Sequence, residues 1–327
     1  MLNLENKTVL ITGGTGSFGK NFTKFLLANT AVKKVIIFSR DELKQFQMAK
    51  ELPDNRLRFF IGDVRELSRL KRAFKEVDIV VHAAALKQVP LLEYNPFEAV
   101  KTNILGTQNV IEAAIDEKIN KVLFISTDKA VQPINLYGST KLCAEKLVIN
   151  GNIYSPDESL FSVVRYGNVV GSRGSIIEHL VNNHLDKVEI TDLEMTRFWI
   201  TLEQSFALVM FALENMAGGE ILVPKIPSMK LSDLFDCLAP NAEKEVIGMR
   251  PGEKLHEILL TKEEARRSLE LEKYFLVLPE QYGLINENKF KKYQSLGKKA
   301  PASFVYASNT NSDWLTKEDL KKIIISK

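Results

Sequence analysis

Short apolar runs alternate with longer amphipathic segments through the first half of the chain. The apolar runs are rich in Val, Ile or Phe and predict six strands, at residues 8–12, 34–38, 58–61, 79–82, 122–126 and 161–165. Apolar positions that recur with helical spacing predict helices at residues 18–28, 42–50, 67–75, 96–116 and 137–150. Strands that are apolar throughout are typical of sheets buried on both faces. We therefore expect an α/β fold with a Rossmann-like, doubly wound parallel sheet.

Beyond about Val169 the pattern is looser, with shorter apolar runs and more prolines and arginines. This change predicts a smaller C-terminal substrate-binding domain. We expect residues 1–168 to form the Rossmann domain, and residues 169–199 and 218–327 to form the substrate domain with the C-terminal tail. The segment 200–217, with a helix at 202–215, is expected to pack back on the Rossmann domain.

Composition narrows the class of protein. The 327 residues are 45% hydrophobic and 26% charged, which is ordinary for a globular protein. A net charge of +3 gives no electrostatic reason to expect a nucleic-acid partner. The N-terminus lacks the features of a signal peptide, and no apolar run approaches the ~20 residues of a membrane span. We expect a cytoplasmic protein that binds neither nucleic acid nor membrane.

A glycine-rich loop follows the first expected strand. Gly13, Gly16 and Gly19 are spaced Gly-x-x-Gly-x-x-Gly and lead into the first expected helix. Glycines let the backbone approach a pyrophosphate, and a helix N-terminus supplies free N–H groups and partial positive charge. The loop predicts a dinucleotide site with contacts at Gly13, Thr15, Gly16, Ser17, Phe18 and Gly19.

The end of the second strand indicates which dinucleotide is bound. An acidic residue there favours NAD, because it binds the ribose 2′-hydroxyl. Here Ser39 and Arg40 stand at that position, and a hydroxyl beside a guanidinium suits the 2′-phosphate of NADP. Asp41 leaves NAD open, and it is also suited to capping the next helix. The expected cofactor contacts at this edge are Ser39, Arg40, Asp41, Glu42, Leu43, Lys44, Asp63 and Val64.

Asp63 and Val64 end the third expected strand. Their position is suited to meeting the adenine ring, and the alternative is an aspartate that caps its own loop.

A Tyr-x-x-x-Lys pair follows the fifth expected strand. Tyr137 and Lys141 are four residues apart, so a helix places both side chains on one face. We expect the Lys141 ammonium group and a cationic nicotinamide ring to lower the pKa of Tyr137, which is ordinarily near ~10. The tyrosine is then able to take a proton from a substrate hydroxyl.

Two charged residues end the fifth apolar run, in Ser126-Thr127-Asp128-Lys129-Ala130. Charged side chains usually seek water, and the simplest interpretation is a strand end at the surface. In a doubly wound sheet, however, ligands bind at the carboxyl ends of the strands. This position favours a functional role for Asp128 and Lys129.

Longer motifs carry a resemblance to a known family. They are "ITGGTGSFGK", "SRDELKQ", "HAAALKQVP", "STDKA", "NLYGSTK", "RYGNVVGSRGS", "MTRFWIT" and "RPGEKLHE". Up to about Glu257 the chain resembles the inverting UDP-N-acetylglucosamine 4,6-dehydratases, which are extended short-chain dehydrogenase/reductases. The resemblance implies the first step of pseudaminic acid synthesis, with tightly bound NADP and UDP-N-acetylglucosamine as substrate. It also implies a homo-oligomer of up to six subunits, for which the helix at 96–116 is a candidate contact surface.

The resemblance implies roles for the charged pair. Oxidation at carbon 4 makes the carbon 5 proton acidic, so a neutral Lys129 would remove it and a protonated Asp128 would protonate the hydroxyl leaving carbon 6. We expect burial to raise the pKa of Asp128 and lower that of Lys129. Hydride then returns to carbon 6, with inversion at carbon 5.

Further contacts are expected with the substrate and with the cofactor. By resemblance, the substrate contacts are Lys87, Tyr137, Asn168, Thr191, Arg250 and Glu253. The remaining cofactor contacts are Ala84, Lys87, Thr102, Asn103, Tyr137, Lys141, Val169 and Arg173. Arg197 and Lys225 are further candidates for gripping the diphosphate.

Other readings stay open at this point. His82 is interpreted as a hydrogen-bonded core histidine. His256 beside Glu257 has no third ligand at suitable spacing, so we expect no metal. A UDP-hexose 4-epimerase would share the glycine loop, Tyr137 and Lys141 but would not need the charged pair. A non-catalytic NADP sensor would not need the tyrosine, the two lysines and the aspartate together.

Overall fold

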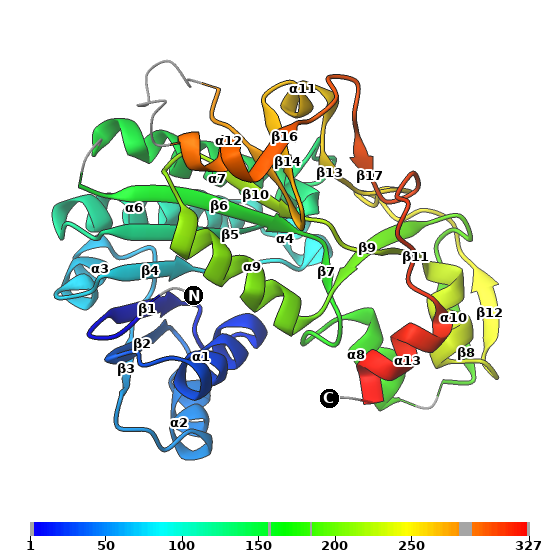
Figure 1. The fold of residues 1–327 in the computed structure, drawn as a ribbon. Coiled ribbons are helices and arrows are strands. Elements are labelled where there is room, and N and C mark those ends of the chain that lie inside the picture. Colours follow the sequence, from blue (N-terminus) through cyan, green and yellow to red (C-terminus); the bar gives the residue numbers. More distant parts are fainter. Residues whose placement is uncertain (1–2, 156–157, 184, 281–289, 326–327) are drawn as a thin grey trace.

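A ten-stranded sheet forms the centre of the computed structural model, which describes residues 3–155, 158–183, 185–280 and 290–325 (Figure 1). Its strand order is β16-β14-β15-β10-β6-β5-β4-β1-β2-β3. Six of these strands are the predicted ones: β1 (Thr8–Thr12), β2 (Lys34–Ser39), β3 (Leu57–Ile61), β4 (Ile79–His82), β5 (Lys121–Thr127) and β6 (Leu160–Tyr166). All six pair in parallel, which confirms the doubly wound parallel sheet.

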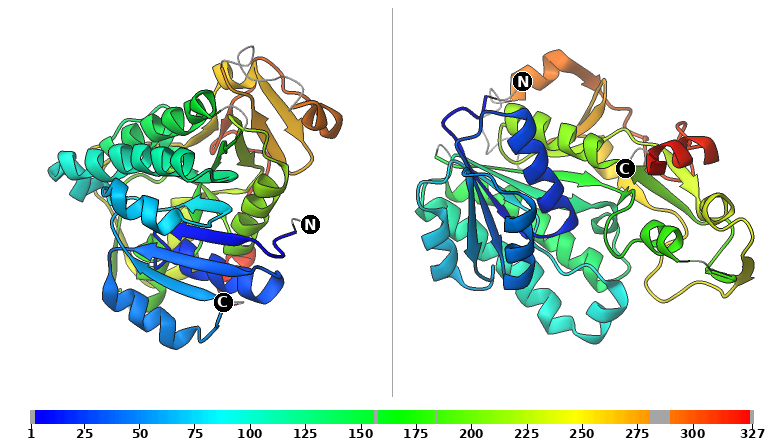
Figure 2. Two further views of the ribbon diagram at one scale, coloured as in Figure 1. Left: turned by 90° about the vertical axis from the view of Figure 1, so that its left-hand side faces the viewer. Right: turned by 90° about the horizontal axis from the view of Figure 1, so that it is seen from below.

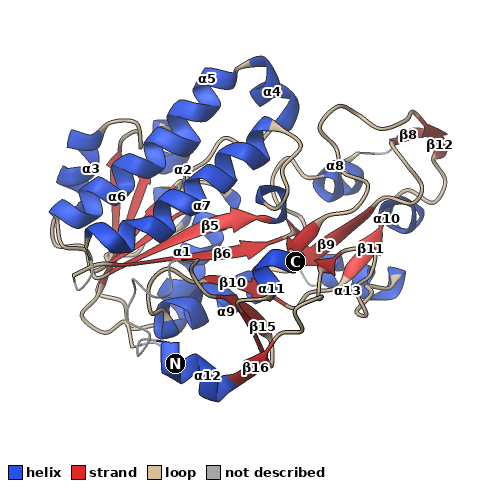
Figure 3. Cartoon of the chain, turned by 90° about the horizontal axis from the view of Figure 1, so that it is seen from above, coloured by secondary structure: helices blue, strands red, loops and turns tan. Residues whose placement is uncertain are grey.

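Helices cover both faces of this sheet. They are α1 (Ser17–Asn29), α2 (Glu42–Glu51), α3 (Leu67–Phe74), α4 (Val89–Tyr94), α5 (Pro96–Ala99), α6 (Gly106–Asp116), α7 (Leu136–Tyr154) and α9 (Leu202–Asn215). Helices α3, α6 and α7 lie side by side on one face (Figure 3). Helix α9 contacts α1 on the other face, and it also touches β5, β6 and β10 (Figure 2).

The single helix predicted at 96–116 differs from the structure in its middle. A π-helical turn at Val100–Leu105 separates α5 from α6. The wider turn adds a residue to the helical repeat, and such turns are frequent at functional sites. Here it carries Thr102 and Asn103, two predicted cofactor contacts, and buries both side chains.

The C-terminal half also contributes to the main sheet. Strand β10 (Ile221–Pro224) pairs in parallel with β6, and β15 (Tyr274–Val277), β14 (Ser268–Leu271) and β16 (Gly297–Lys299) continue the sheet in antiparallel pairing. These strands come from residues that the sequence analysis assigned to the substrate domain. The division into two domains stays a prediction.

A smaller lobe lies beside the carboxyl ends of the parallel strands (Figure 1). Three short sheets belong to this half of the chain: β7 (Asn168–Val169) with β9 (Thr196–Ile200) and β11 (Ser228–Lys230), β8 (Lys187–Ile190) with β12 (Glu243–Val246), and β13 (Ile258–Leu260) with β17 (Tyr306–Ala307). Besides α9, the described helices of this half are α8 (Ile176–Asn182), α10 (Leu231–Leu238), α11 (Lys262–Ala265), α12 (Lys291–Leu296) and α13 (Lys317–Ile325). Trp199, Leu234 and Leu320 belong to a second apolar cluster, separate from the core of the main sheet.

The strands β1 and β4 are buried throughout, and the apolar residues of β1, β4 and β5 belong to the main core, which runs along the sheet. Among the described residues, none of the helices combines the length and the apolar character that crossing a bilayer requires.

Candidate active site

The glycine loop between β1 and α1 lines a cavity of 300 Å³ at the carboxyl ends of the first strands. Gly13 has a φ of +64°, and a Cβ there would lie 2.9 Å from the Ala84 backbone. At Gly19 a Cβ would lie 2.6 Å from the Gly14 backbone. Neither position admits a side chain, so the backbone stays open to a phosphate group. The buried Thr102 Oγ1 in the cavity wall has no hydrogen-bond partner within the described chain, and this also fits a bound dinucleotide.

At the end of β2, Ser39 and Arg40 line the same cavity. The Ser39 hydroxyl is buried and accepts hydrogen bonds from Thr15 Oγ1 at 3.2 Å and from Gln45 Nε2 at 3.1 Å. The Arg40 side chain is half exposed beside it. The structure therefore brings together a hydroxyl and a half-exposed guanidinium, which pairs with Asp63 at 3.4 Å, in the cavity wall at the end of β2.

Asp41 caps helix α2, because its carboxylate accepts a hydrogen bond from the Lys44 N–H at 2.9 Å. This confirms the capping alternative for Asp41, although Asp41 and Lys44 both line the cavity as well. Asp63 also lines the cavity, and its carboxylate caps its own loop by accepting a hydrogen bond from the Arg65 N–H at 3.0 Å, while its contact with adenine stays a prediction. Val64 also lines the cavity, whereas Glu42 and Leu43 are exposed on α2 and are not among its lining residues.

A second cavity of 570 Å³ adjoins the first and shares Gly13 and Gly16 with it. Its walls combine the glycine loop with the ends of β5, β6 and β7. The predicted site residues in its lining are Gly13, Gly16, Ser17, Phe18, Gly19, Lys87, Lys129, Tyr137, Lys141, Asn168, Val169 and Arg173. Residues separated by up to 160 positions in the sequence therefore face one space of a size suited to a small-molecule ligand.

Tyr137 and Lys141 lie one turn apart on α7 and both line this cavity. The Lys141 ammonium group donates to the Ile125 carbonyl at 2.7 Å and lies 3.8 Å from the centre of the Phe124 ring. Burial lowers the pKa of Lys141 to about 7. The lysine is therefore held against β5 with a weakened charge.

The expected lowering of the Tyr137 pKa is wrong for the protein chain itself. Burial raises the pKa of Tyr137 to about 12, and it outweighs the opposing effect of Lys129. Lys141 is not among the groups that lower this pKa, and its ammonium group donates to a carbonyl of β5. Any lowering of this pKa must come from a cationic ligand beside the phenol.

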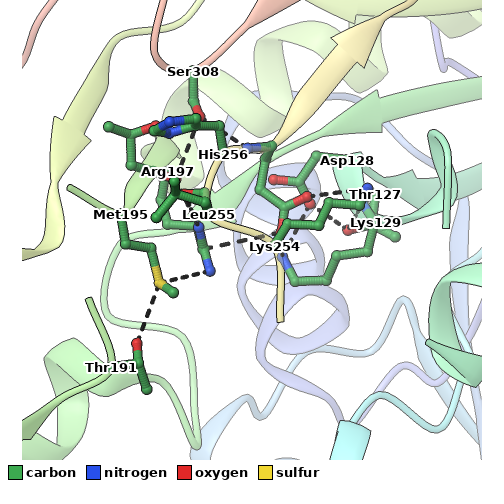
Figure 4. Close-up of polar contacts among 12 residues, drawn as sticks. Thr127, Asp128, Lys129, Thr191, Met195, Arg197, Lys254, Leu255, His256 and Ser308 are labelled. Carbon is green, nitrogen blue, oxygen red and sulfur yellow. Dashed lines mark hydrogen bonds and ion pairs between the residues drawn. The ribbon is translucent and has the colours of Figure 1, made fainter. Parts of the chain in front are cut away.

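Asp128 and Lys129 begin the turn after β5, and Asp128 is completely buried. Asp128 Oδ1 accepts hydrogen bonds from Thr127 Oγ1 at 2.9 Å and from Lys129 Nζ at 3.1 Å (Figure 4). Asp128 Oδ2 is buried and has no hydrogen-bond partner among the described residues. Burial raises the pKa of Asp128, as expected, although Lys129 and the Thr127 hydroxyl oppose this effect.

The direction expected for Lys129 is wrong. Burial opposes its charge, but the carboxylates of Asp128 and Glu257 outweigh burial and raise the pKa of Lys129. Lys129 Nζ lies 3.1 Å from Asp128 Oδ1 and 3.7 Å from Glu257 Oε1. A neutral Lys129 therefore requires its proton to move to a neighbouring carboxylate or to a ligand.

Glu257 is the residue that sequence reasoning missed, since it was considered only as a neighbour of His256. Its buried carboxylate also lies 4.0 Å from Arg197 Nε and 3.4 Å from Lys254 Nζ. Burial works against its ionisation, but Lys129, Arg197 and Lys254 together lower the pKa of Glu257. The available signal was a carboxylate directly before the apolar run 258–260, the counterpart of Asp128 directly after an apolar run.

Arg173 and Lys87 close the cavity beside the glycine loop. The Arg173 guanidinium donates to the Thr15 carbonyl, and the Arg173 N–H donates to Ser17 Oγ at 2.9 Å. Lys87 Nζ donates to the Arg173 carbonyl at 3.3 Å. Desolvation, Lys129 and Arg173 lower the pKa of Lys87. Two cationic side chains thus lie where a diphosphate would pass.

The predicted substrate contacts are not all in one place. Asn168 lines the larger cavity, and its buried Oδ1 has no partner within the described chain. Glu253 likewise has a buried, unpartnered Oε2. Arg250 is half exposed and pairs with Glu189 at 2.9 Å, while Thr191 Oγ1 donates to Met195 Sδ at 3.5 Å. Thr191, Arg250 and Glu253 are outside the lining of the larger cavity.

The two further diphosphate candidates differ in position. Arg197 is buried close to the charged cluster and donates to the carbonyl oxygens of Thr196 and Leu255 (Figure 4). Lys225 pairs instead with Glu270 of β14 at 3.0 Å, which places it on the far part of the main sheet. The structure gives Lys225 no contact with the candidate site.

His82 is a core histidine, as predicted. Its ring nitrogens lie 2.7 Å from Thr12 Oγ1 and 3.0 Å from Thr107 Oγ1, and burial lowers its pKa to about 3. His256 Nδ1 lies 2.9 Å from Thr196 Oγ1. Within the described ranges, no three His, Cys, Asp or Glu side chains are grouped so as to hold a metal ion, and the absence of a metal stays a prediction.

Known proteins with similar sequences include enzymes that act on sugar nucleotides. A family model described as polysaccharide biosynthesis protein matches residues 9–279. A UDP-N-acetylglucosamine 4,6-dehydratase (inverting) of Campylobacter jejuni serotype O:2 is 48% identical over 98% of both chains. A UDP-glucose 4-epimerase of Rickettsia conorii is 41% identical over 98% of this chain and 96% of its own.

The solved structures agree with the fold. The X-ray structure of Pen from Bacillus thuringiensis superposes with a TM-score of 0.89 at 40% identity and covers 99% of each chain. This chain belongs to the polysaccharide biosynthesis protein family, within the extended short-chain dehydrogenase/reductases that include sugar-nucleotide 4,6-dehydratases.

Proposed function

We propose that this protein is a UDP-N-acetylglucosamine 4,6-dehydratase that inverts carbon 5. The product would be UDP-2-acetamido-2,6-dideoxy-β-L-arabino-hexos-4-ulose. The observation that carries the proposal is the acid–base pair Asp128–Lys129, which lies beside the cavity that Tyr137 and Lys141 also line. The 48% identity to the inverting dehydratase of Campylobacter jejuni supports the same substrate.

The chain's own residues move protons in three places. Tyr137 takes the proton of the carbon 4 hydroxyl, for which a cationic ligand must first lower its pKa. Lys129 lines the cavity and removes the carbon 5 proton. The Asp128 proton leaves with the carbon 6 hydroxyl as water. Since Asp128 is fully buried, its proton reaches the cavity through the Thr127 hydroxyl, which contacts Asp128 and lines the cavity.

The cofactor cradle fits a nicotinamide dinucleotide, which, when bound, supplies a hydride acceptor for carbon 4 and returns that hydride to carbon 6. The sugar then loses water with no net oxidation. Inversion requires the proton to leave one face of carbon 5 and return to the other. Lys129 serves the first face in this scheme.

NADP is the proposed cofactor, because Ser39 and Arg40 stand at the ribose end of the cavity with Lys44 nearby. Titration of the purified protein with NADP and NAD tests this choice. We expect tighter binding of NADP, and tighter binding of NAD would contradict the proposed choice of cofactor.

The proposed setting is the first step of pseudaminic acid synthesis, in the cytoplasm and in a homo-oligomer. Leu91, Tyr94 and Phe97, on α4 and α5, expose 64%, 86% and 77% of their surface. A group of exposed apolar side chains supports a contact surface between subunits there.

A UDP-hexose 4-epimerase is the second candidate, because relatives with that name are about as long as this chain and 41% identical. Proton NMR of the protein with UDP-N-acetylglucosamine in deuterium oxide separates the two. A new 6-methyl signal with deuterium at carbon 5 supports the dehydratase, and ring couplings report inversion. The 4-epimer alone would favour the epimerase.

A further inference from the structure

Lys129 lies between two carboxyl groups that reach it from distant parts of the chain. Asp128 is its neighbour in sequence, whereas Glu257 comes from the segment before β13. Lys129 Nζ is 3.1 Å from the first carboxylate and 3.7 Å from the second. The side chains of both acids are at most 3% exposed, while that of Lys129 is 25% exposed. The lysine is thus the member of this cluster that faces the ligand cavity.

Glu257 is fixed by a segment that is itself anchored close to the active-site turn. Lys254 Nζ donates to the Val131 carbonyl at 2.5 Å, and Asn135 Nδ2 donates to the Gly252 carbonyl at 2.8 Å. The Ser308 hydroxyl accepts a hydrogen bond from the Glu257 N–H at 2.9 Å. These contacts hold the Glu257 backbone, so its carboxylate is directed to Lys129 by the fold rather than by a flexible surface loop.

Among the described residues, charged or titratable groups from four parts of the chain surround the lysine. They are Asp128 and Tyr137 beside the β5 turn, Lys87 after β4, Arg197 on β9, and Lys254 and Glu257 before β13. Only two of them, Asp128 and Glu257, are carboxylates. Both are buried and outside the cavity lining. Asp128 contacts the Thr127 hydroxyl, which lines the cavity, whereas the Glu257 carboxylate pairs with cations, so we expect Asp128 to be the one that exchanges a proton with substrate.

We propose that Glu257 is a positioning residue whose carboxylate holds Lys129 against Asp128 and adjusts the pH range in which this pair works. The proposal deepens the dehydratase function proposed above and rests on it for its kinetic consequence. The working pair must carry one proton in total, on Asp128, with Lys129 free to accept another. The negative charge of Glu257 favours the protonated form of both groups. It therefore sets the pH range over which the pair holds a single proton.

The first test follows Lys129 itself, with no need for turnover. Protein labelled with carbon-13 at the lysine ε-carbons is titrated by NMR, and the Lys129 signal is assigned with Lys129→Arg. In Glu257→Gln, which keeps the shape and removes the charge, we expect the Lys129 titration to move to lower pH by about one to three units. An unchanged titration would overturn the proposal.

The second test measures kcat/KM against pH with UDP-N-acetylglucosamine. In Glu257→Gln both limbs of the profile are expected to move to lower pH, because one charge acts on both members of the pair. Glu257→Asp keeps the charge and should restore much of the wild-type profile. A lower rate with unmoved limbs would mean a purely structural role and would also overturn the proposal.

Two further variants distinguish the proposed role of Glu257 from a folding defect and from the general effect of neutralising a buried carboxylate. Lys254→Met removes a cation beside Glu257, so the Lys129 titration should move in the opposite direction, to higher pH, even if Glu257→Gln does not fold. Glu264→Gln is the matched control, because it neutralises another largely buried carboxylate that pairs with Arg165 instead of Lys129. If wild-type protein forms no 6-methyl product, the dehydratase function fails, while the Lys129 titration still decides the role of Glu257.

Discussion

Two buried ion clusters in this protein share one arrangement of charges and differ in character. In each, a cation lies between two carboxylates, at least one of which comes from a distant segment. Arg165 of β6 binds Glu145 of α7 at 2.7 Å and Glu264 of α11 at 3.0 Å. Lys129 binds Asp128 at 3.1 Å and lies 3.7 Å from Glu257.

The clusters differ in whether a proton is able to move. The Arg165 guanidinium uses all five N–H donors: two reach Glu145, two reach Glu264, and one reaches the Leu259 carbonyl. Arginine does not deprotonate in proteins, so this cluster has one charge state. In the other cluster a lysine faces the cavity and Asp128 Oδ2 is left unpartnered. The first network is closed, whereas the second leaves a carboxyl oxygen without a partner among the described residues, as the proposed proton transfer requires.

Removing Lys129 gives the sharpest test of this contrast. Lys129→Ala should slow deuterium incorporation at carbon 5 by about 10²–10⁴-fold, the usual contribution of a general base. Cofactor binding should persist, because Lys129 is not part of the glycine-loop cradle. Proton NMR in deuterium oxide measures the exchange, and Lys118→Ala, at an exposed lysine, is the control. Full-rate incorporation by Lys129→Ala would rule out this lysine as the base.

Removing Arg165 should have the opposite outcome. Arg165→Met leaves Glu145 and Glu264 facing each other without a cation, and we expect a loss of about 3–5 kcal/mol in the free energy of unfolding. Urea denaturation measures this loss. The triple variant Arg165→Met, Glu145→Gln, Glu264→Gln removes every charge and should recover much of it. Equal stability of Arg165→Met and wild type would show that the closed network is not a stabilising one.

The sequence predicted one cluster in part and the other not at all. Asp128 and Lys129 are adjacent and follow an apolar strand, so a local pattern was enough to find them. Glu257 is more than 120 residues away, and only tertiary packing brings it to Lys129. The same is true of Arg165, whose two partners lie 20 and 99 residues away.

Local patterns also determined how well the fold was predicted. The parallel strands β1 to β6 were found because each is a short apolar run bounded by polar residues. The π-helical turn at Val100–Leu105 was missed, because helical spacing does not distinguish one widened turn from a regular helix. The pKa direction expected for Lys129 was wrong, because it depends on how many carboxylates tertiary packing places around the amine.

Acid should weaken the closed network through Glu264. Burial opposes the charge of this carboxylate, but Arg165 outweighs burial and lowers its pKa below the ordinary 4.5. A carboxyl whose pKa is lower in the folded state stabilises the protein above its unfolded pKa, and this contribution is lost as the pH falls through the folded value. Glu264→Gln should therefore be less stable than wild type by about 1.5–3 kcal/mol at pH 7, as for a charged hydrogen bond.

The difference in the free energy of unfolding between wild type and Glu264→Gln should shrink below pH ~4.5, as the wild-type carboxyl takes up a proton. Thermal or urea denaturation at a series of pH values measures it. Glutamine at this position still satisfies the capping box with Thr261, so the cap of α11 is preserved. A difference that stays constant down to strongly acidic pH would show that the loss comes from packing instead of charge.

Helix α7 connects the two clusters. A change of charge at one end of this connection should shift the titration of Lys141 only slightly, a smaller effect than those predicted above. Tyr137, Lys141 and Glu145 follow one another at intervals of four residues along the helix. Burial lowers the pKa of Lys141 to about 7, and the charge of Glu145 partly counteracts burial. Glu145→Gln should therefore move the titration of Lys141 to still lower pH, by a fraction of a unit to about one unit.

Carbon-13 NMR of the lysine ε-carbons measures this shift, with Lys141→Arg used to assign the signal. Glu264→Gln is the matched control, because Glu264 also binds Arg165 but does not act on Lys141. If Glu145→Gln and Glu264→Gln moved the Lys141 titration equally, the change would come from loosening of the Arg165 network. If only Glu145→Gln moves it, the closed network supplies charge to the catalytic helix, and the two clusters differ in proton mobility without being electrostatically independent.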